Sequence, residues 1–196
     1  AGIIPERTIV GLEGSFFVPG PAKEWAFKQD PFGAAAIFLG ASIPERRLTA
    51  SQAVGLARDL VNKGKTVLLL GGKDAVSPAR ELLKACADER IRDLTGRLTI
   101  AQTAAVLQQS ELLIAPDSGI LHLACSVGTP TVALFGPGNE KKWGPRGQKH
   151  RTVSLCLSCS PCTRFGYTIT TCSKNYPCLS SLAADRLLEI LKEPHV

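Results

Sequence analysis

The chain has 196 residues, 44 % of them hydrophobic, which is enough to bury one sizeable core and fits a single domain. No apolar run reaches the roughly 18 residues of a membrane span, and the opening AGIIPERTIV lacks the charged head and apolar body of a signal peptide, so we expect a cytoplasmic protein. The net charge of +6 comes from Lys and Arg scattered along the sequence, which disfavours nucleic acid as the partner and fits an anionic small molecule.

The first 33 residues differ in character from the rest. Residues 1–33 carry Gly, Pro and isolated aromatic side chains, and we interpret them as a linker or the tail of a missing N-terminal domain. The sequence contains no Met, which also suggests a part of a larger protein. Residues 34–196 are expected to form one α/β domain.

Short apolar runs from residue 34 onward predict buried strands. They lie at 34–40, 66–71, 111–115 and 129–136, with a weaker candidate near Ile91–Leu94. Each run is too apolar to face water on either side, which is typical of a parallel sheet covered by helices on both faces.

Helices are predicted between these strands from their boundary signals. The start signals are the capping boxes formed by Thr49 with Gln52 and by Thr99 with Gln102, and an N-cap followed by proline at Ser77 and Pro78. Gly64 is a C-terminal stop signal, and a last helix is expected over 181–192.

The alternation of strands and helices predicts an α/β fold, a Rossmann-like doubly wound parallel sheet. Its ligand crevice should lie beyond the carboxyl ends of the strands. Neither G-x-x-x-x-G-K-[ST] nor a G-x-G-x-x-G between strand and helix occurs, which argues against an ordinary kinase, GTPase or NAD enzyme.

One predicted helix start carries polar residues that a buried helix does not need. Asp117 follows the strand 111–115 and is expected to be the N-cap, so that Ser118, Gly119 and Ile120 present N–H groups at the positive helix end, an anion site. Gly119 would let a phosphate approach the backbone, and His122 shares a helix face with Ser118. The alternative is an ordinary capped helix whose His bonds to the backbone.

Five of the seven cysteines lie within residues 156–178. In a cytosolic protein such density favours a metal site over disulfides, and a closed structural Zn or iron site is expected from Cys159, Cys162, Cys172 and Cys178. Reduced thiols without metal, or disulfides formed during purification, are the alternatives. Cys86 and Cys125 are interpreted as small core residues.

The segment DSGILHLA followed by GTPTVALFGP resembles the signature of the ADP-heptose:lipopolysaccharide heptosyltransferases, glycosyltransferase family nine. The segments FLGASIPERRLT, LLLGGKD, LTGRLTIAQ and WGPRG fall in the family's order. The resemblance covers nearly the whole chain and implies the C-terminal, donor-binding half of a two-domain GT-B glycosyltransferase.

The resemblance also implies roles for individual residues. Those expected at the ADP part of the donor are Asp117, Ser118, Gly119 and His122 at the signature, Ser42 and Arg46 at the phosphates, Asp74 at the ribose and Leu98 on the adenine. A solvated pair Arg46 and Arg47, and a core Leu98, are the alternatives for these positions.

The implied reaction is inverting transfer of a heptose from ADP-heptose to a lipopolysaccharide-core acceptor. It needs no cofactor, and the general base is expected in the missing N-terminal domain, so this chain alone should bind donor and hardly turn it over. A branch of the family that modifies autotransporters resembles the cysteine pattern around an iron. The alternatives are a non-catalytic, metal-stapled nucleotide-binding or assembly module, and a transferase for another nucleotide sugar. A place at the inner face of the membrane is a further expectation.

Overall fold

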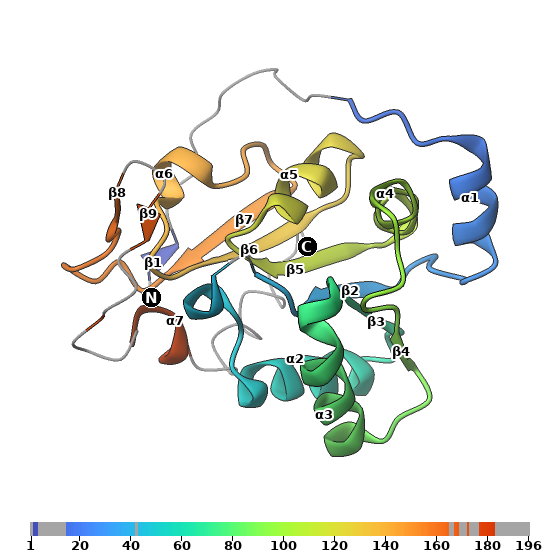
Figure 1. Ribbon diagram of the computed structural model, residues 1–196, viewed down its shortest axis with the longest axis horizontal. Coiled ribbons are helices and arrows are strands. Elements are labelled where there is room, and N and C mark those ends of the chain that lie inside the picture. The colour runs from blue at the N-terminus through green and yellow to red at the C-terminus, as the bar shows by residue number, and fades with distance from the viewer. Residues whose placement is uncertain are drawn as a thin grey trace.

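The computed structural model describes residues 2–3, 15–41, 43–164, 167–168, 172 and 177–182. Within them lies one sheet in the order β1-β7-β6-β5-β2-β3-β4 (Figure 1). Its strands are β1 (Gly2–Ile3), β2 (Ala35–Phe38), β3 (Val67–Leu70), β4 (Ile91–Asp93), β5 (Leu112–Pro116), β6 (Thr131–Phe135) and β7 (His150–Ser154). A separate pair is formed by β8 (Thr163–Arg164) and β9 (Tyr167–Thr168).

The six strands from β2 to β7 are parallel, and β1 pairs antiparallel with β7. The chain runs from β2 outward through β3 to β4, then returns to the other side of β2 and continues through β5, β6 and β7. The strand order therefore reverses between β2 and β5, which is the switch point where doubly wound sheets bind ligands. The predicted fold class and the five predicted strands are confirmed.

Helices cover both faces of this sheet (Figure 1). They are α1 (Gly20–Phe27), α2 (Ala50–Asn62), α3 (Val76–Cys86), α4 (Ile100–Gln109), α5 (Gly119–Ser126), α6 (Glu140–Trp143) and α7 (Pro177–Ser180), with 3-10 turns at Pro44–Arg46 and Lys73–Ala75. The helices α2 and α3 pack with one core cluster, and α1, α4 and α5 pack with the other.

Alternation along the central strand produces these two clusters. In β2, Ala35 and Ile37 belong to the cluster under α2 and α3, whereas Ala36 belongs to the opposite one. Successive side chains of a strand point to opposite faces, so a strand buried on both faces must be apolar throughout.

The helix signals are confirmed with one exception. Thr49 and Thr99 form the predicted capping boxes, and Gly64 follows α2 with φ +79°. The prediction at Ser77 is wrong: the turn Lys73–Ala75 leads directly into α3, whose N-cap is Ala75, and Ser77 and Pro78 lie in the first helical turn. Proline is tolerated there because first-turn N–H groups have no partner within the helix.

Two predictions concern the ends of the chain. Within the residues assigned to a linker or tail, α1 packs against α4 and buries Ala22 and Ala26; the domain division itself stays a prediction. The helix α7 precedes the predicted last helix, residues 181–182 are not helical, and the rest of the span 181–192 lies outside the described residues.

Candidate functional site

The switch point brings together two charged residues that are far apart in the sequence. Arg46 lies in the 3-10 turn after β2, and Asp117 directly follows β5. The Nη1 atom of Arg46 lies 3.1 Å from Oδ2 of Asp117, and the side chains are only 14 % and 10 % exposed. The carboxyl ends of β2 and β5 thus carry a largely buried ion pair where the fold predicts ligand binding.

Asp117 is fixed by its surroundings on several sides. Its backbone N–H donates to the carbonyl of Leu134 at 3.1 Å. Burial raises the pKa of its carboxyl, while the charges of Arg46 and His122 oppose this rise. A Cβ atom on Gly138, in the loop after β6, would overlap Oδ2 of Asp117. Glycine at 138 is therefore required for this carboxylate to occupy its place.

The helix start beside this pair differs from the prediction in one residue. The N-cap of α5 is Ser118 and not Asp117, because the Asp117 carboxylate turns toward Arg46. The Ser118 hydroxyl donates to the carbonyl of Pro116 at 2.9 Å, so no side chain caps the helix. Gly119 is exposed, with nothing within 4 Å of where a Cβ would stand. The positive end of α5 is thus accessible to an anion.

His122 lies one turn further along α5 and is exposed. Its ring packs edge-on against Trp143 at a centroid distance of 6.2 Å, and the Lys142 ammonium lies 4.8 Å from the Trp143 ring. Trp143 and Lys142 were missed by sequence reasoning. The segment WGPRG indicates only a place in the family's order along the chain, and nothing in its local sequence predicts that α6 approaches α5.

A second ion pair joins the loops after β2 and β3. Arg47 Nη2 lies 3.0 Å from Oδ2 of Asp74, and the side chains are partly exposed. The ribose candidate Asp74 is therefore next to the predicted phosphate site but engaged with Arg47. Leu98 is half-buried and packs against the core cluster of α4. Ser42 lies outside the described residues.

The cysteine segment borders the same region. Cys162 donates its N–H to the carbonyl of Pro137, and the Ser160 hydroxyl donates to that of Gly136. These bonds dock the segment on the loop 136–138, which also contains the glycine that contacts Asp117. Burial raises the pKa of the Cys162 thiol, and the charge of Arg46 opposes this rise.

Two of the four predicted metal ligands, Cys162 and Cys178, have a raised pKa to which the other thiols contribute after burial. Burial raises the pKa of Cys178, and the thiols of Cys162, Cys159 and Cys172 raise it further. None of the cysteines forms a disulfide in the described part of the chain. Among the described residues, however, no three His, Cys, Asp or Glu side chains stand close enough together to hold a metal ion.

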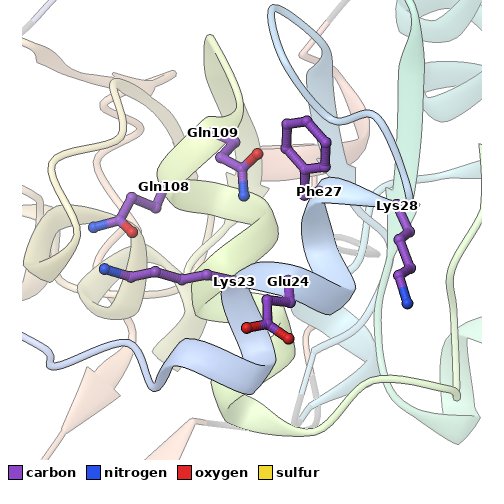
Figure 2. A pocket seen from close by; sticks show the side chains of 6 residues that line it. All are labelled: Lys23, Glu24, Phe27, Lys28, Gln108 and Gln109. Carbon is purple, nitrogen blue, oxygen red and sulfur yellow. The ribbon is translucent and has the colours of Figure 1, made fainter.

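A cavity of about 570 Å³ lies elsewhere, between α1 and α4. Figure 2 shows Lys23, Glu24 and Phe27 on α1 crossing the end of α4, which carries Gln108 and Gln109. Since β5 begins just after α4, this cavity is near the amino ends of the strands. It is not part of the candidate site. No helix in the described residues is long and apolar enough to cross a membrane.

The reversed strand order, with a cation and an open helix start at its switch point, defines an α/β domain of the Rossmann type with an anion-binding arrangement. The chain belongs to glycosyltransferase family 9 (heptosyltransferase), whose family model matches residues 21–171.

Individual relatives agree with this assignment. The chain is 29 % identical over 115 residues to lipopolysaccharide heptosyltransferase 2 of Salmonella typhimurium, covering 57 % of this chain and 33 % of the relative. The solved structure of the Escherichia coli ADP-heptose lipopolysaccharide heptosyltransferase II matches with a TM-score of 0.73 at 24 % identity, over 90 % of this chain and 52 % of that one. The iron-containing dodecameric glycosyltransferase TibC of Escherichia coli shares the fold, with a TM-score of 0.61 at 14 % identity over 82 % of this chain and 45 % of that one. This chain therefore spans about half the length of these solved relatives.

Proposed function

We propose that this chain binds the ADP part of ADP-heptose in an enzyme that transfers the heptose to a lipopolysaccharide-core acceptor with inversion. The observation that carries the proposal is the buried pair of Arg46 and Asp117 beside the uncapped start of α5, at the switch point of the sheet. Membership of glycosyltransferase family 9 supports the class of reaction. The name of the matched Escherichia coli structure supports the donor.

In this proposal the diphosphate takes the place prepared by two positive groups. Arg46 donates to the phosphate oxygens, and the backbone N–H groups of Gly119 and Ile120 add the field of the helix start. Asp117 orients Arg46, since its carboxylate is held between that guanidinium and Gly138. Because the ion pair already holds the Arg46 side chain, little further conformational entropy is lost when it binds the phosphates.

The remaining donor-site residues are proposed on the strength of the family resemblance. Ser118 and His122 would lie on the same side of α5 as the diphosphate. Leu98 would pack on the adenine, Asp74 would accept from the ribose hydroxyls, and Ser42 would donate to a phosphate.

The reaction is a single in-line displacement. The acceptor hydroxyl oxygen forms a bond to the anomeric carbon while the bond from that carbon to the β-phosphate oxygen breaks, and ADP leaves with the electron pair. Arg46 and the start of α5 stabilise the charge that develops on the leaving diphosphate. The hydroxyl proton passes to a general base, which we place in the N-terminal half found in longer family members.

We further propose a structural role for a metal, Zn or iron, on Cys159, Cys162, Cys172 and Cys178. Four thiols are a donor set that both ions accept, and the Cys159 and Cys172 thiols add to the rise in the pKa of Cys162 and of Cys178 that burial causes. Metal analysis of the purified chain should find about one ion per chain, lost in a Cys159→Ser, Cys162→Ser variant. Full metal content in that variant would reject these ligands.

Calorimetric titration with ADP, with UDP in parallel, tests the donor proposal. The wild type should bind ADP more tightly than UDP, and Arg46→Ala should weaken ADP binding by about 10- to 100-fold, the loss of one charge-assisted contact. The matched control is Lys28→Ala, which removes the same charge next to α1 and should change nothing. Equal affinity for UDP would favour another nucleotide sugar, and no nucleotide binding would favour a non-catalytic module.

A further inference from the structure

A second cavity, of about 420 Å³, lies at the opposite edge of the sheet from β7. Its walls are α3, the turn before α3, and the loop that follows β4. Volumes of this order hold small ligands in proteins. Neither the family resemblance nor the proposed diphosphate site assigns this cavity a role.

Three cations line the cavity without a partner. In the described part of the chain, Lys73, Arg80 and Arg97 make neither an ion pair nor a side-chain hydrogen bond. Four arginines elsewhere in the described part of the chain form ion pairs with carboxylates: Arg46–Asp117, Arg47–Asp74, Arg90–Asp88 and Arg92–Asp30. Converging cations repel one another, so this arrangement gains stability from an anion.

The one carboxylate that lines the cavity, Asp93, offsets only part of this positive charge. Oδ1 of Asp93 accepts from the backbone N–H of Thr95 at 2.9 Å and from its hydroxyl at 2.6 Å. This side chain is thus used to shape the loop after β4. The cavity keeps an excess of positive charge.

The start of α3 adds to that excess. Its N-cap, Ala75, has no side-chain acceptor, whereas Thr49 and Thr99 cap α2 and α4. The N–H of Val76 already donates to the carbonyl of Lys73, so this end of the helix contributes its dipole field and not that donor. Val76, the first residue of this 11-residue helix, lines the cavity together with Lys73. The positive end of the helix therefore lies beside the cations.

The loop that closes the cavity is held in a fixed place. Gly96 has φ +68°, and its N–H donates to the carbonyl of Gly71 at 2.9 Å. A Cβ at this position would lie 2.8 Å from Cγ2 of Val76. The close approach of loop and helix presents Arg97 and Arg80 to the same space.

We propose that this cavity binds a phosphate group carried by a soluble small molecule, at a site separate from the diphosphate site at Arg46. Guanidinium groups pair with phosphate oxygens through two parallel hydrogen bonds, and two arginines, a lysine and a helix start match a group with two or more negative charges. The cavity adjoins Asp74 and Leu98 in sequence, so its ligand binds next to the nucleoside end of the proposed donor site.

Titration of the ¹⁵N-labelled chain with inorganic pyrophosphate, followed by NMR, tests this site separately from the donor site. The amide signals of Thr95 and Gly96 report on the cavity, and those of Ser118 and Gly119 report on the start of α5. In the wild type, pyrophosphate should shift Thr95 and Gly96. In an Arg80→Gln, Arg97→Gln variant the same shifts should need at least about tenfold more pyrophosphate.

The control is a Lys23→Gln, Lys28→Gln variant, which removes two charges near the cavity of Figure 2. It should titrate at Thr95 and Gly96 like the wild type, and the unfolding temperatures of all three proteins should agree within a few degrees. Equal weakening in this control would show general attraction by net charge, and unmoved Thr95 and Gly96 signals in the wild type would overturn the proposal. Neither result bears on the donor proposal. That proposal is tested by the shifts of the Ser118 and Gly119 signals when ADP is added.

Discussion

At the scale of single residues, the ion pair between Arg46 and Asp117 fits into a space with little room beside position 138. Asp117 can face Arg46 only because position 138 carries no side chain. The sequence predicted both charged residues as part of a donor site, but from separate segments of the family resemblance. Their contact follows from the strand order, which brings β5 next to β2, and no local pattern encodes it.

Gly138→Ala tests whether Asp117 positions Arg46 for donor binding. The new Cβ would overlap the Asp117 carboxylate, so the aspartate must move and its ion pair with Arg46 is lost. We expect ADP affinity to fall at least about tenfold, with a stability loss of about 1–3 kcal/mol typical of overpacking. Calorimetry and thermal unfolding measure the two effects.

Gly20→Ala is the matched control, because nothing lies within 4 Å of a Cβ at that position on α1. It should leave ADP affinity unchanged. If Gly138→Ala also bound ADP like the wild type, Asp117 would have no part in positioning Arg46.

At the scale of secondary-structure elements, most of the architecture was predictable because parallel strands buried on both faces must be uniformly apolar. The strand β7 was missed: its sequence HRTVS begins with two basic residues, and only Val153 and Ser154 are buried. The start of α3 was misplaced because the 3-10 turn before it contains no side-chain cap to mark the boundary. The position of an element cannot be predicted from its own residues when its stability comes from packing against neighbouring elements.

The two capping boxes give a matched test of how the C-terminal segment is attached. Gln52 and Gln102 play the same role at the starts of α2 and α4. Gln52 is also buried, and its side-chain amide donates to the carbonyls of Leu179 and Leu182, both at 2.7 Å. Gln52→Ala should therefore cost about 1–3 kcal/mol more than Gln102→Ala, since it leaves two buried carbonyls without their donor.

Urea unfolding of both variants measures this difference. Equal losses would mean that the contact between α2 and residues 179–182 contributes nothing to stability. A larger loss for Gln102→Ala would contradict the structure outright.

At the scale of the whole molecule, the chain carries the residues proposed for donor binding but spans about half of the solved relatives it matches. The proposed donor-site residues that the structure describes lie in the loops and in the start of α5, which follow the carboxyl ends of the strands. The proposed displacement also needs an acceptor hydroxyl aligned with the anomeric carbon, and a base for its proton. Alignment and general-base catalysis are large contributions to rate, and neither is proposed for this chain.

The chain on its own should therefore bind donor without transferring the sugar. We expect calorimetry to detect ADP binding that Arg46→Ala weakens, while release of ADP from ADP-heptose in the presence of a lipopolysaccharide-core acceptor stays at least about 100-fold below that of full-length Escherichia coli heptosyltransferase II. ADP binding and turnover are measured on the same preparation of this chain. If ADP still binds, the absence of turnover cannot be attributed to misfolding. Turnover near that of the full-length enzyme would show that a base and an acceptor site lie within these 196 residues, and would require the division of roles proposed here to be abandoned.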